Sequence, residues 1–294
     1  MLIARLIADP DTLGDNLALA MERIEEAGGE VAGAGMLDTN DDVLELELTE
    51  GDPALVRAIL DELFPDADLL LTDQPVTVPH LFVSDMDSTM IGQECIDELA
   101  DFAGLKARIA AITERAMQGE LDFEAALRER VGLLADVPEA TIAQCLDERI
   151  RPMDGARTLV ATLKAHGCHT VLVTGGFHAF ADPVAEQLGF ARVVGNRLEV
   201  AEGRLTGSLD GPIVDGSVKL QVLQDEAARL GEGAISLATG DGANDIPMIA
   251  AATYGVAFRA KPRARDAANG RIDRGDLTAV LALLGIARER WVIA

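Results

Sequence analysis

Two acidic residues, Asp85 and Asp87, stand two positions apart directly after the short apolar run Leu81–Ser84. An apolar run of this length is typical of a strand that is buried on both faces. Two carboxylates at the end of such a strand are costly to bury unless a positive group binds there. A divalent metal with a phosphate would meet that requirement. The ordinary alternative is a helix start with either aspartate as its N-cap.

Three further segments carry residues of related chemistry. Thr174-Gly175-Gly176 ends a second apolar run, and a hydroxyl with exposed backbone N–H groups at a strand-to-helix turn suits an anion. Lys219 lies in the amphipathic segment Val218–Leu230, and Gly240–Asp245 ends a third apolar run with two more acids. Each segment alone also fits an ordinary turn or helix. Their order along the chain, at the ends of expected strands, indicates one shared site.

The elements that must position these residues alternate between helix and strand after Pro152. This alternation predicts a parallel sheet with helices on both faces, and ligands bind such sheets beyond the carboxyl ends of the strands. A loop at 201–203 is expected to join two strands as a hairpin. The expected helices are 158–165, 180–188 and 245–252, and the expected strands are 81–84, 170–174, 191–195, 197–200, 204–208 and 235–239.

Two other regions flank the first strand of that sheet. Residues 93–150 are almost wholly helical in pattern and are expected to cover the site as a cap. Residues 1–74 form a separate unit in the order βαββαβ, which predicts a four-stranded sheet with two helices on one face. Residues 75–80 contain Pro75 and Pro79 and are expected to be the linker.

Composition restricts the functional classes. The 294 residues are 49% hydrophobic and carry a net charge of −25, which argues against nucleic acid or an anionic membrane as a partner. Residues 1–80 hold 19 acids and 3 bases, giving −16, and the remainder hold 31 acids and 22 bases, giving −9. Neither a signal sequence nor an apolar run of membrane-spanning length is recognisable. Three scattered cysteines fit a reducing compartment, so we expect a cytoplasmic protein.

Taken together, Asp85–Thr89, Thr174–Gly176, Lys219 and Gly240–Asp245 resemble the four motifs of the haloacid dehalogenase (HAD) superfamily of phosphohydrolases. One departure is Thr174, where a serine is commoner, but the hydroxyl is kept. Further residues resemble the phosphoserine phosphatase family within it, over roughly 81–284. They are Glu94, Met117, Phe123, Arg130, Asn196-Arg197-Leu198, Leu205-Thr206-Gly207 and Ala260-Lys261-Pro262.

The resemblance implies a fold class and a regulatory module. The fold is expected to be α/β, with a HAD-type Rossmann-like parallel sheet in residues 81–294 and a helical cap, about 93–150, inserted after its first strand. Residues 1–74 resemble, in element order and position, the small α+β ferredoxin-like ACT module found before some bacterial phosphoserine phosphatases. That likeness implies a homodimer and serine as a feedback ligand.

The resemblance also assigns the reaction. Asp85 would be the nucleophile, and Asp87 the general acid and base. Mg²⁺ would be held by Asp85, Asp241 and the backbone carbonyl of Asp87, while Asp245 would orient the metal's waters or Lys219. The phosphoryl oxygens would be held by a set of polar residues: Thr174, Gly175, Lys219 and Asn244.

Selection of the substrate is expected to lie in the cap. Glu94 would accept the ammonium of phosphoserine, Arg130 would bind its carboxylate, and Met117 and Phe123 would shield the site. The implied activity is Mg²⁺-dependent hydrolysis of O-phospho-L-serine through an aspartyl-phosphate, the last step of serine biosynthesis. The alternatives are a phosphatase or phosphotransferase for another small phosphate ester, a non-catalytic amino-acid sensor and, less favoured because Asp87 suits a phosphatase, a dehalogenase.

Overall fold

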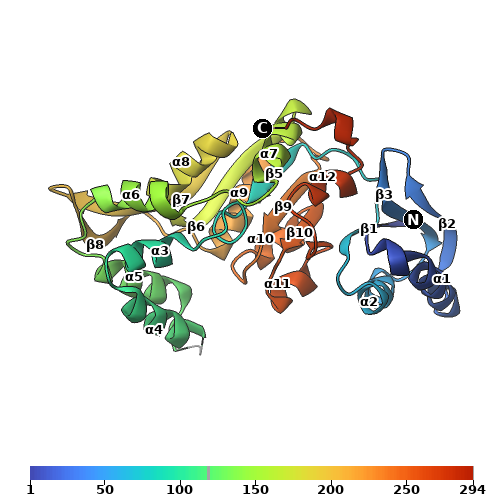
Figure 1. The fold of residues 1–294 in the computed structure, drawn as a ribbon, viewed down its shortest axis with the longest axis horizontal. Coiled ribbons are helices and arrows are strands. Elements are labelled where there is room, and N and C mark those ends of the chain that lie inside the picture. The colour runs from blue at the N-terminus through green and yellow to red at the C-terminus, as the bar shows by residue number, and fades with distance from the viewer. Residues whose placement is uncertain (118–119, 294) are drawn as a thin grey trace.

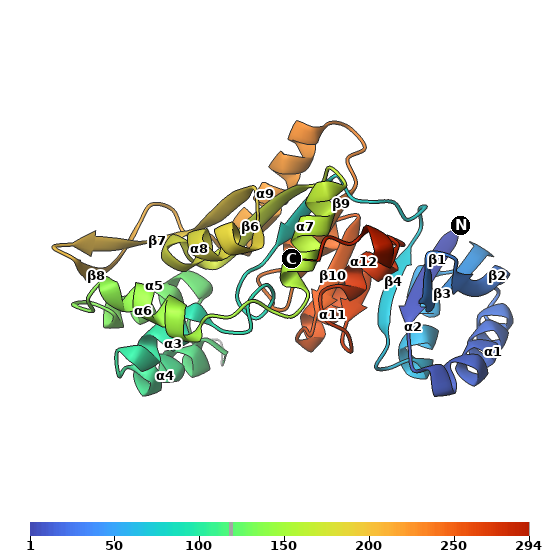
Figure 2. The ribbon, with the colours of Figure 1, turned by 45° about the horizontal axis from the view of Figure 1, so that its top comes forward.

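The computed structural model describes residues 1–117 and 120–293, apart from the side chain of Met117. The N-terminal elements lie at one end of an elongated molecule, the helices within residues 95–149 lie at the other end, and a parallel sheet lies between them (Figure 1; Figure 2). Within the described residues, no helix is both long enough and apolar enough to cross a bilayer.

The first six elements form an antiparallel sheet covered by two helices. The strands lie in the order β2-β3-β1-β4, and the inward side chains Leu2, Ala4 and Leu6 share a core with α1 and α2. Both helices begin in the same way, with a capping aspartate followed by proline. The bounds are β1 (Leu2–Ile7), α1 (Pro10–Glu26), β2 (Glu30–Leu37), β3 (Asn40–Glu50), α2 (Pro53–Leu63) and β4 (Asp68–Thr72).

The predicted parallel sheet is confirmed, with neighbouring strands in the order β11-β10-β9-β5-β6-β7. Leu81 and Val83 pack toward α9 and α10, whereas Phe82 packs into the core on the other face with α7 and α8. The strands are β5 (Leu81–Ser84), β6 (His169–Phe177), β7 (Arg192–Ala201), β9 (Ser236–Gly240), β10 (Tyr254–Phe258) and β11 (Gly270–Ile272). The helices are α7 (Ala156–Ala165), α8 (His178–Leu188), α9 (Gly216–Leu230) and α10 (Ile246–Ala251).

The helical insertion follows β5, as expected. It consists of α3 (Cys95–Phe102), α4 (Lys106–Met117), α5 (Phe123–Leu133) and α6 (Ala140–Arg149). Strand β8 (Arg204–Asp210) pairs antiparallel with β7, and the resulting hairpin reaches the insertion at α5 (Figure 1). A Cβ on Gly207 would lie 3.2 Å from the Gly132 carbonyl oxygen, so the hairpin and α5 approach closely because this residue is glycine.

The two sheets are joined edge to edge. Strand β4 pairs antiparallel with β11, so the eleven strands formed by the described residues make one continuous sheet. Beside this seam, the fully buried Arg271 donates to the backbone carbonyls of Phe64 (2.8 Å) and Ala67 (3.1 Å) and pairs with Asp61. The chain ends with α11 (Pro262–Ala267), α12 (Ala279–Leu283) and the 3₁₀ turn η1 (Arg288–Arg290).

Two details of the predicted sheet were wrong. The strand expected at 170–174 continues to Phe177, because an irregularity between Val173 and Phe177 lets the strand resume its pairing with β7 beyond the two glycines. The strands expected at 191–195 and 197–200 are one strand, β7, which pairs with β6 along its first half and with β8 along its second. Strands β10 and β11 were not predicted.

Candidate active site

Three neighbouring strands carry the acidic and hydroxyl residues to one edge of the sheet. Asp85 follows β5, Thr174 lies on β6, and Asp241 follows β9, and β5 lies between the other two strands. The carboxyl ends of these parallel strands therefore bring the residues together, although they are distant in sequence. They line a cavity of about 640 Å³ between the sheet edge and the cap. Its wall also includes Asp87, Glu94, Phe123, Arg130, Gly175 and Asn244.

Lys219 is completely buried and contacts two carboxylates. Its Nζ atom lies 2.6 Å from Oδ1 of Asp85 and 2.7 Å from Oδ1 of Asp245. Burial by itself would lower the pKa of Lys219, but the two negative charges raise it above its ordinary value. Burial and the charge of Asp245 raise the pKa of Asp85, and Lys219 opposes that rise. One lysine thus forms ion pairs with two buried carboxylates.

The start of α9 fixes the position of this lysine. The Asp215 side chain accepts hydrogen bonds from the backbone N–H groups of Ser217 and Val218, and it thereby caps the helix four residues before Lys219. A Cβ on Gly216 would lie 2.7 Å from the backbone oxygen of Asn244. Glycine at this position therefore allows the helix start to approach the loop that carries Asp241.

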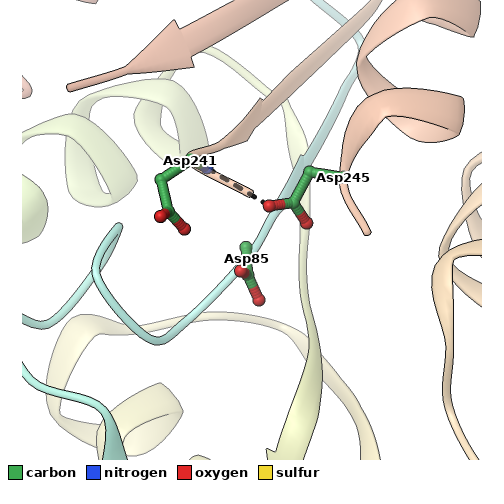
Figure 3. Close-up of side chains that lie close together, drawn as sticks. All are labelled: Asp85, Asp241 and Asp245. Atoms are coloured by element: carbon green, nitrogen blue, oxygen red, sulfur yellow. Dashed lines mark hydrogen bonds between the residues drawn. The ribbon is translucent and has the colours of Figure 1, made fainter. Parts of the chain in front are cut away.

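Three carboxylates form a compact acidic cluster. One oxygen each from Asp85, Asp241 and Asp245 lie within 4.8 Å of one another (Figure 3). Asp245 already accepts hydrogen bonds from Lys219 and from the backbone N–H groups of Asp241 (3.2 Å) and Gly242 (2.9 Å). Three acids and one lysine leave an excess of two negative charges, and all the donors are oxygens. Both properties fit a hard divalent cation.

Asp87 lies in the same cavity with a perturbed carboxyl group. Burial, together with the negative charge of Glu94, raises the pKa of Asp87 to about 7. Its Oδ1 atom is buried and has no hydrogen-bond partner among the described residues. A carboxyl group that titrates near neutrality and has an unused oxygen can donate a proton and later accept one.

The segment after Val173 presents small polar groups to the cavity. Thr174 is buried, and its hydroxyl accepts a hydrogen bond from the backbone N–H of Gly176 at 2.8 Å. The methyl group of this threonine has room because residue 195 is glycine. A Cβ at that position would lie only 3.2 Å from the methyl group. Asn196 donates to the carbonyl of Gly175 at 2.8 Å, which fixes the backbone of this segment.

Glu94 and Arg130 bring opposite charges from the cap side. Glu94 is exposed, stands at the N-cap of α3, and accepts a hydrogen bond of 2.7 Å from the Ser88 hydroxyl. Arg130 donates to the Ala126 carbonyl on its own helix at 3.3 Å. Burial lowers the pKa of Arg130, and nearby acids, of which Asp97 is the strongest, oppose that change. Both charged groups face one cavity.

Two apolar residues were expected to shield the site. Phe123 begins α5 and lines the cavity, and its ring would lie 3.2 Å from a Cβ on Gly175. The cap can therefore touch the β6 segment at this point because residue 175 has no side chain. Met117 ends α4, and its side chain lies outside the described residues.

Three residues of the site were given no role from the sequence, although Ser88 and Lys261 stand within the motifs named there. Ser88 holds Glu94 and has a positive φ of 55°, an uncommon backbone conformation for a serine. Asp215 caps α9, and the pattern Asp-Gly-Ser before an amphipathic segment is a signal that could have found it. Lys261 lines the cavity with its Nζ atom 3.9 Å from Oδ2 of Asp241. Nothing in the local sequence indicates that contact.

Comparisons with known proteins agree with this geometry. A phosphoserine phosphatase of Mycobacterium tuberculosis is 44% identical over 210 residues, which are 71% of this chain and 51% of that protein. This chain therefore spans about half the length of that relative. A HAD family hydrolase of Salmonella enterica serovar Typhi superposes with a TM-score of 0.83 at 30% identity, covering 96% of this chain and 98% of the other.

A second solved structure is a phospho-aspartyl intermediate analogue of a phosphoserine phosphatase. It has a TM-score of 0.64 and is 37% identical, covering 69% of this chain and 98% of that one. The family model described as haloacid dehalogenase-like hydrolase matches residues 82–250, the region that contains all the acidic residues of the cavity. The chain therefore belongs to the haloacid dehalogenase-like hydrolase family.

Proposed function

We propose that this protein is a Mg²⁺-dependent phosphoserine phosphatase, which hydrolyses O-phospho-L-serine to serine and inorganic phosphate. One observation carries the proposal. Asp85 lies in ion contact with the buried Lys219, and the same cavity holds Asp87, whose pKa is raised to about 7. A nucleophile beside a proton carrier is the pair that ester hydrolysis through a covalent intermediate requires.

In the first step, an oxygen of Asp85 attacks phosphorus and the bond from phosphorus to the seryl oxygen breaks. Asp87 gives its proton to the departing oxygen, so serine leaves as a neutral alcohol. Two like unit charges near 4 Å repel by about 4 kcal/mol at an effective dielectric constant of 20. Lys219, at 2.6 Å from Asp85, offsets this repulsion between the nucleophile and the phosphate.

In the second step, water attacks phosphorus of the aspartyl-phosphate and the bond to the Asp85 oxygen breaks. Asp87 is now a carboxylate and accepts the proton of that water, which returns both residues to their starting states. A group with a pKa of about 7 suits both directions of transfer at neutral pH. The unused Oδ1 atom of Asp87 is available for this proton.

Mg²⁺ would be held by Asp85, Asp241 and the backbone carbonyl of Asp87. When bound, it would neutralise charge on the phosphoryl group and on the acids around it. Asp245 already accepts three hydrogen bonds, and its role would be to hold Lys219 and the Asp241 loop in place. The excess of two negative charges in the cluster supports a divalent ion.

Four groups would hold the phosphoryl oxygens: the Thr174 hydroxyl, the backbone N–H of Gly175, the Lys219 ammonium and the Asn244 amide. Except for Lys219, which lies behind Asp85, they line the cavity. The capped start of α9 would hold Lys219 in place during the reaction, and the hydrogen bond from Asn196 to the Gly175 carbonyl would hold the backbone beside Thr174.

Recognition of the serine portion would fall to the cap. Glu94, held by Ser88, would accept the ammonium, and Arg130 would bind the carboxylate with two parallel hydrogen bonds. Phe123, with Met117, would close the site to water. Phosphoserine carries one ammonium, one carboxylate and one phosphate, and the cavity offers a counterpart to each of these groups.

We further propose that residues 1–74 form an ACT-like regulatory and dimerisation domain, joined through residues 75–80 to the phosphatase domain, 81–294, with its cap at about 93–150. The order of β1 to β4 with two helices on one face supports the likeness. Serine would be the feedback ligand. Light scattering with and without serine tests both ideas, and a monomer whose activity is unaffected by serine would contradict them.

A biosynthetic role in the cytoplasm would complete the proposal, and three buried free cysteines are compatible with a reducing compartment. The test is phosphate release from a panel of phosphorylated amino acids and sugars with Mg²⁺. We expect preference for phosphoserine, loss of activity in Asp85→Asn, and loss of preference in Glu94→Gln and Arg130→Ala. Equal rates across the panel would favour a phosphatase of other specificity, and full activity of Asp85→Asn would contradict the mechanism.

A further inference from the structure

The turn Ala260-Lys261-Pro262 joins β10 to α11 and reaches the active-site loop. The backbone N–H of Lys261 donates to the carbonyl of Asp241 at 3.0 Å, and its Nζ atom lies 3.9 Å from Oδ2 of the same residue. Lys261 stands at the N-cap of α11, and Pro262 begins the helix. The backbone contact anchors the turn to the loop, while the side chain, 64% exposed, is free to reorient.

The charges around the cavity make this lysine distinctive. Of the described residues that line the cavity, five are acidic, namely Asp85, Asp87, Glu94, Asp215 and Asp241, and two are basic. Arg130 belongs to the cap, and Lys261 belongs to the sheet domain. Lys219 is fully buried behind Asp85 and cannot meet an approaching ligand first. A phosphate dianion that enters this acidic cavity therefore meets Lys261 as the accessible cation of the sheet side.

We propose that Lys261 is a positioning residue with two linked effects on this site. Its ammonium lies 3.9 Å from Oδ2 of Asp241, and both residues line the cavity, so it competes with a divalent cation for that carboxylate. It also attracts the phosphorylated substrate toward the cluster, which lowers KM and leaves the chemical step unchanged. The second effect rests on the proposed phosphatase function, whereas the first depends only on the acidic cluster.

Removing the charge of Lys261 should change the two affinities in opposite directions. The negative potential at Asp241 increases when the ammonium is lost, so divalent cations bind more tightly. The attraction for a dianionic substrate decreases at the same time, most strongly at low ionic strength where screening is weak. A merely structural role at the start of α11 would weaken both affinities together.

The experiment compares Lys261→Gln with Lys261→Arg and Arg263→Gln. Arg263 lies two residues further on in the same helix, is exposed, and is not among the residues that line the cavity, so its substitution is a matched change of charge. Titration calorimetry measures Mg²⁺ binding to each intact protein without substrate. Steady-state phosphate release from phosphoserine is then measured at low and at high ionic strength.

For Lys261→Gln we expect Mg²⁺ binding to tighten by about 2- to 5-fold and KM to rise by about 3- to 10-fold at low salt, with kcat within about 2-fold. Lys261→Arg and Arg263→Gln should resemble the unmodified protein. The inference is overturned if Lys261→Gln binds Mg²⁺ equally or more weakly, or if KM rises equally at both salt concentrations or not at all. If the unmodified protein releases no phosphate from phosphoserine, the proposed function fails, and the calorimetry alone decides whether Lys261 competes with the cation.

Discussion

Nζ of Lys219 lies 2.6 Å from Oδ1 of Asp85, and both groups are shielded from solvent by the sheet edge and α9. Asp245 shares the same ammonium at 2.7 Å. The arrangement leaves more buried negative than positive charge. This excess lowers the stability of the folded state, but it favours the binding of a cation, which can in turn hold a phosphate.

Lys219→Met should abolish phosphate release and destabilise the fold. Without the ammonium, two buried carboxylates repel each other with no compensating charge, and loss of one partner from a buried ion pair costs about 3–5 kcal/mol. Urea unfolding at pH 7.5 measures the effect. Lys106→Met, at an exposed lysine, is the control and should change the free energy of unfolding little. Equal stability of the two variants would mean that the Lys219 pair adds nothing to folding.

Asp241→Asn should stabilise the metal-free protein above about pH 6. Burial, with the charge of Asp245, raises the pKa of Asp241 to about 6 from 3.8. The stability that such a carboxyl group contributes is fully present below its unfolded pKa and is lost as pH rises through the folded pKa. In EDTA the free energy of unfolding of the variant should therefore rise relative to that of the unmodified protein, by about 1–2 kcal/mol, as pH increases from about 4 to about 6, and the difference should stay constant at higher pH.

Thermal unfolding with and without Mg²⁺ completes that test. Mg²⁺ should raise Tm of the unmodified protein, because a ligand that binds only the folded state stabilises it, and should raise Tm of Asp241→Asn much less. Asp266→Asn, at an exposed aspartate of α11, is the control for loss of one negative charge. An equal Mg²⁺ effect in all three proteins would remove Asp241 from the proposed metal ligands.

The pH dependence of kcat/KM should report Asp87. This residue must carry a proton to release serine, so the rate constant should fall as pH rises through about 7. Glu94→Gln removes a negative charge that raises the pKa of Asp87 and should move the falling limb to lower pH. The substrate titrates identically with both enzymes, so the difference between the profiles isolates the protein group. Superimposable limbs would contradict this assignment.

Arg271→Met should weaken the seam between the sheets. The substitution leaves Asp61 and the carbonyls of Phe64 and Ala67 without their donor, which should cost about 3–5 kcal/mol because these groups stay buried or half-buried. Limited proteolysis in residues 73–80 and urea unfolding measure the loss. Arg274→Met, at a half-exposed neighbour, is the control.

The seam between β4 and β11 also affects how the N-terminal unit can be tested. Deletion of residues 1–74 would expose the edge of β11, so point substitutions test this unit more cleanly.

The sequence alone determined the strand-end chemistry of this protein. Asp85, Thr174 and Asp241 each end an apolar run, and a parallel sheet brings such ends to one edge whatever the details of the loops. Strand β5 was predicted with the bounds that the structure has, because its apolar run is a local signal.

Only the tertiary structure decided which distant groups meet. The pairing of β4 with β11 depends on two strands about 200 residues apart, and β11 is too short to carry a recognisable pattern. The contact between Lys261 and Asp241 likewise depends on how a turn packs beside a loop from another strand. Local periodicity specifies where strands and helices form, but contacts across long sequence separations arise from packing, which no local pattern encodes.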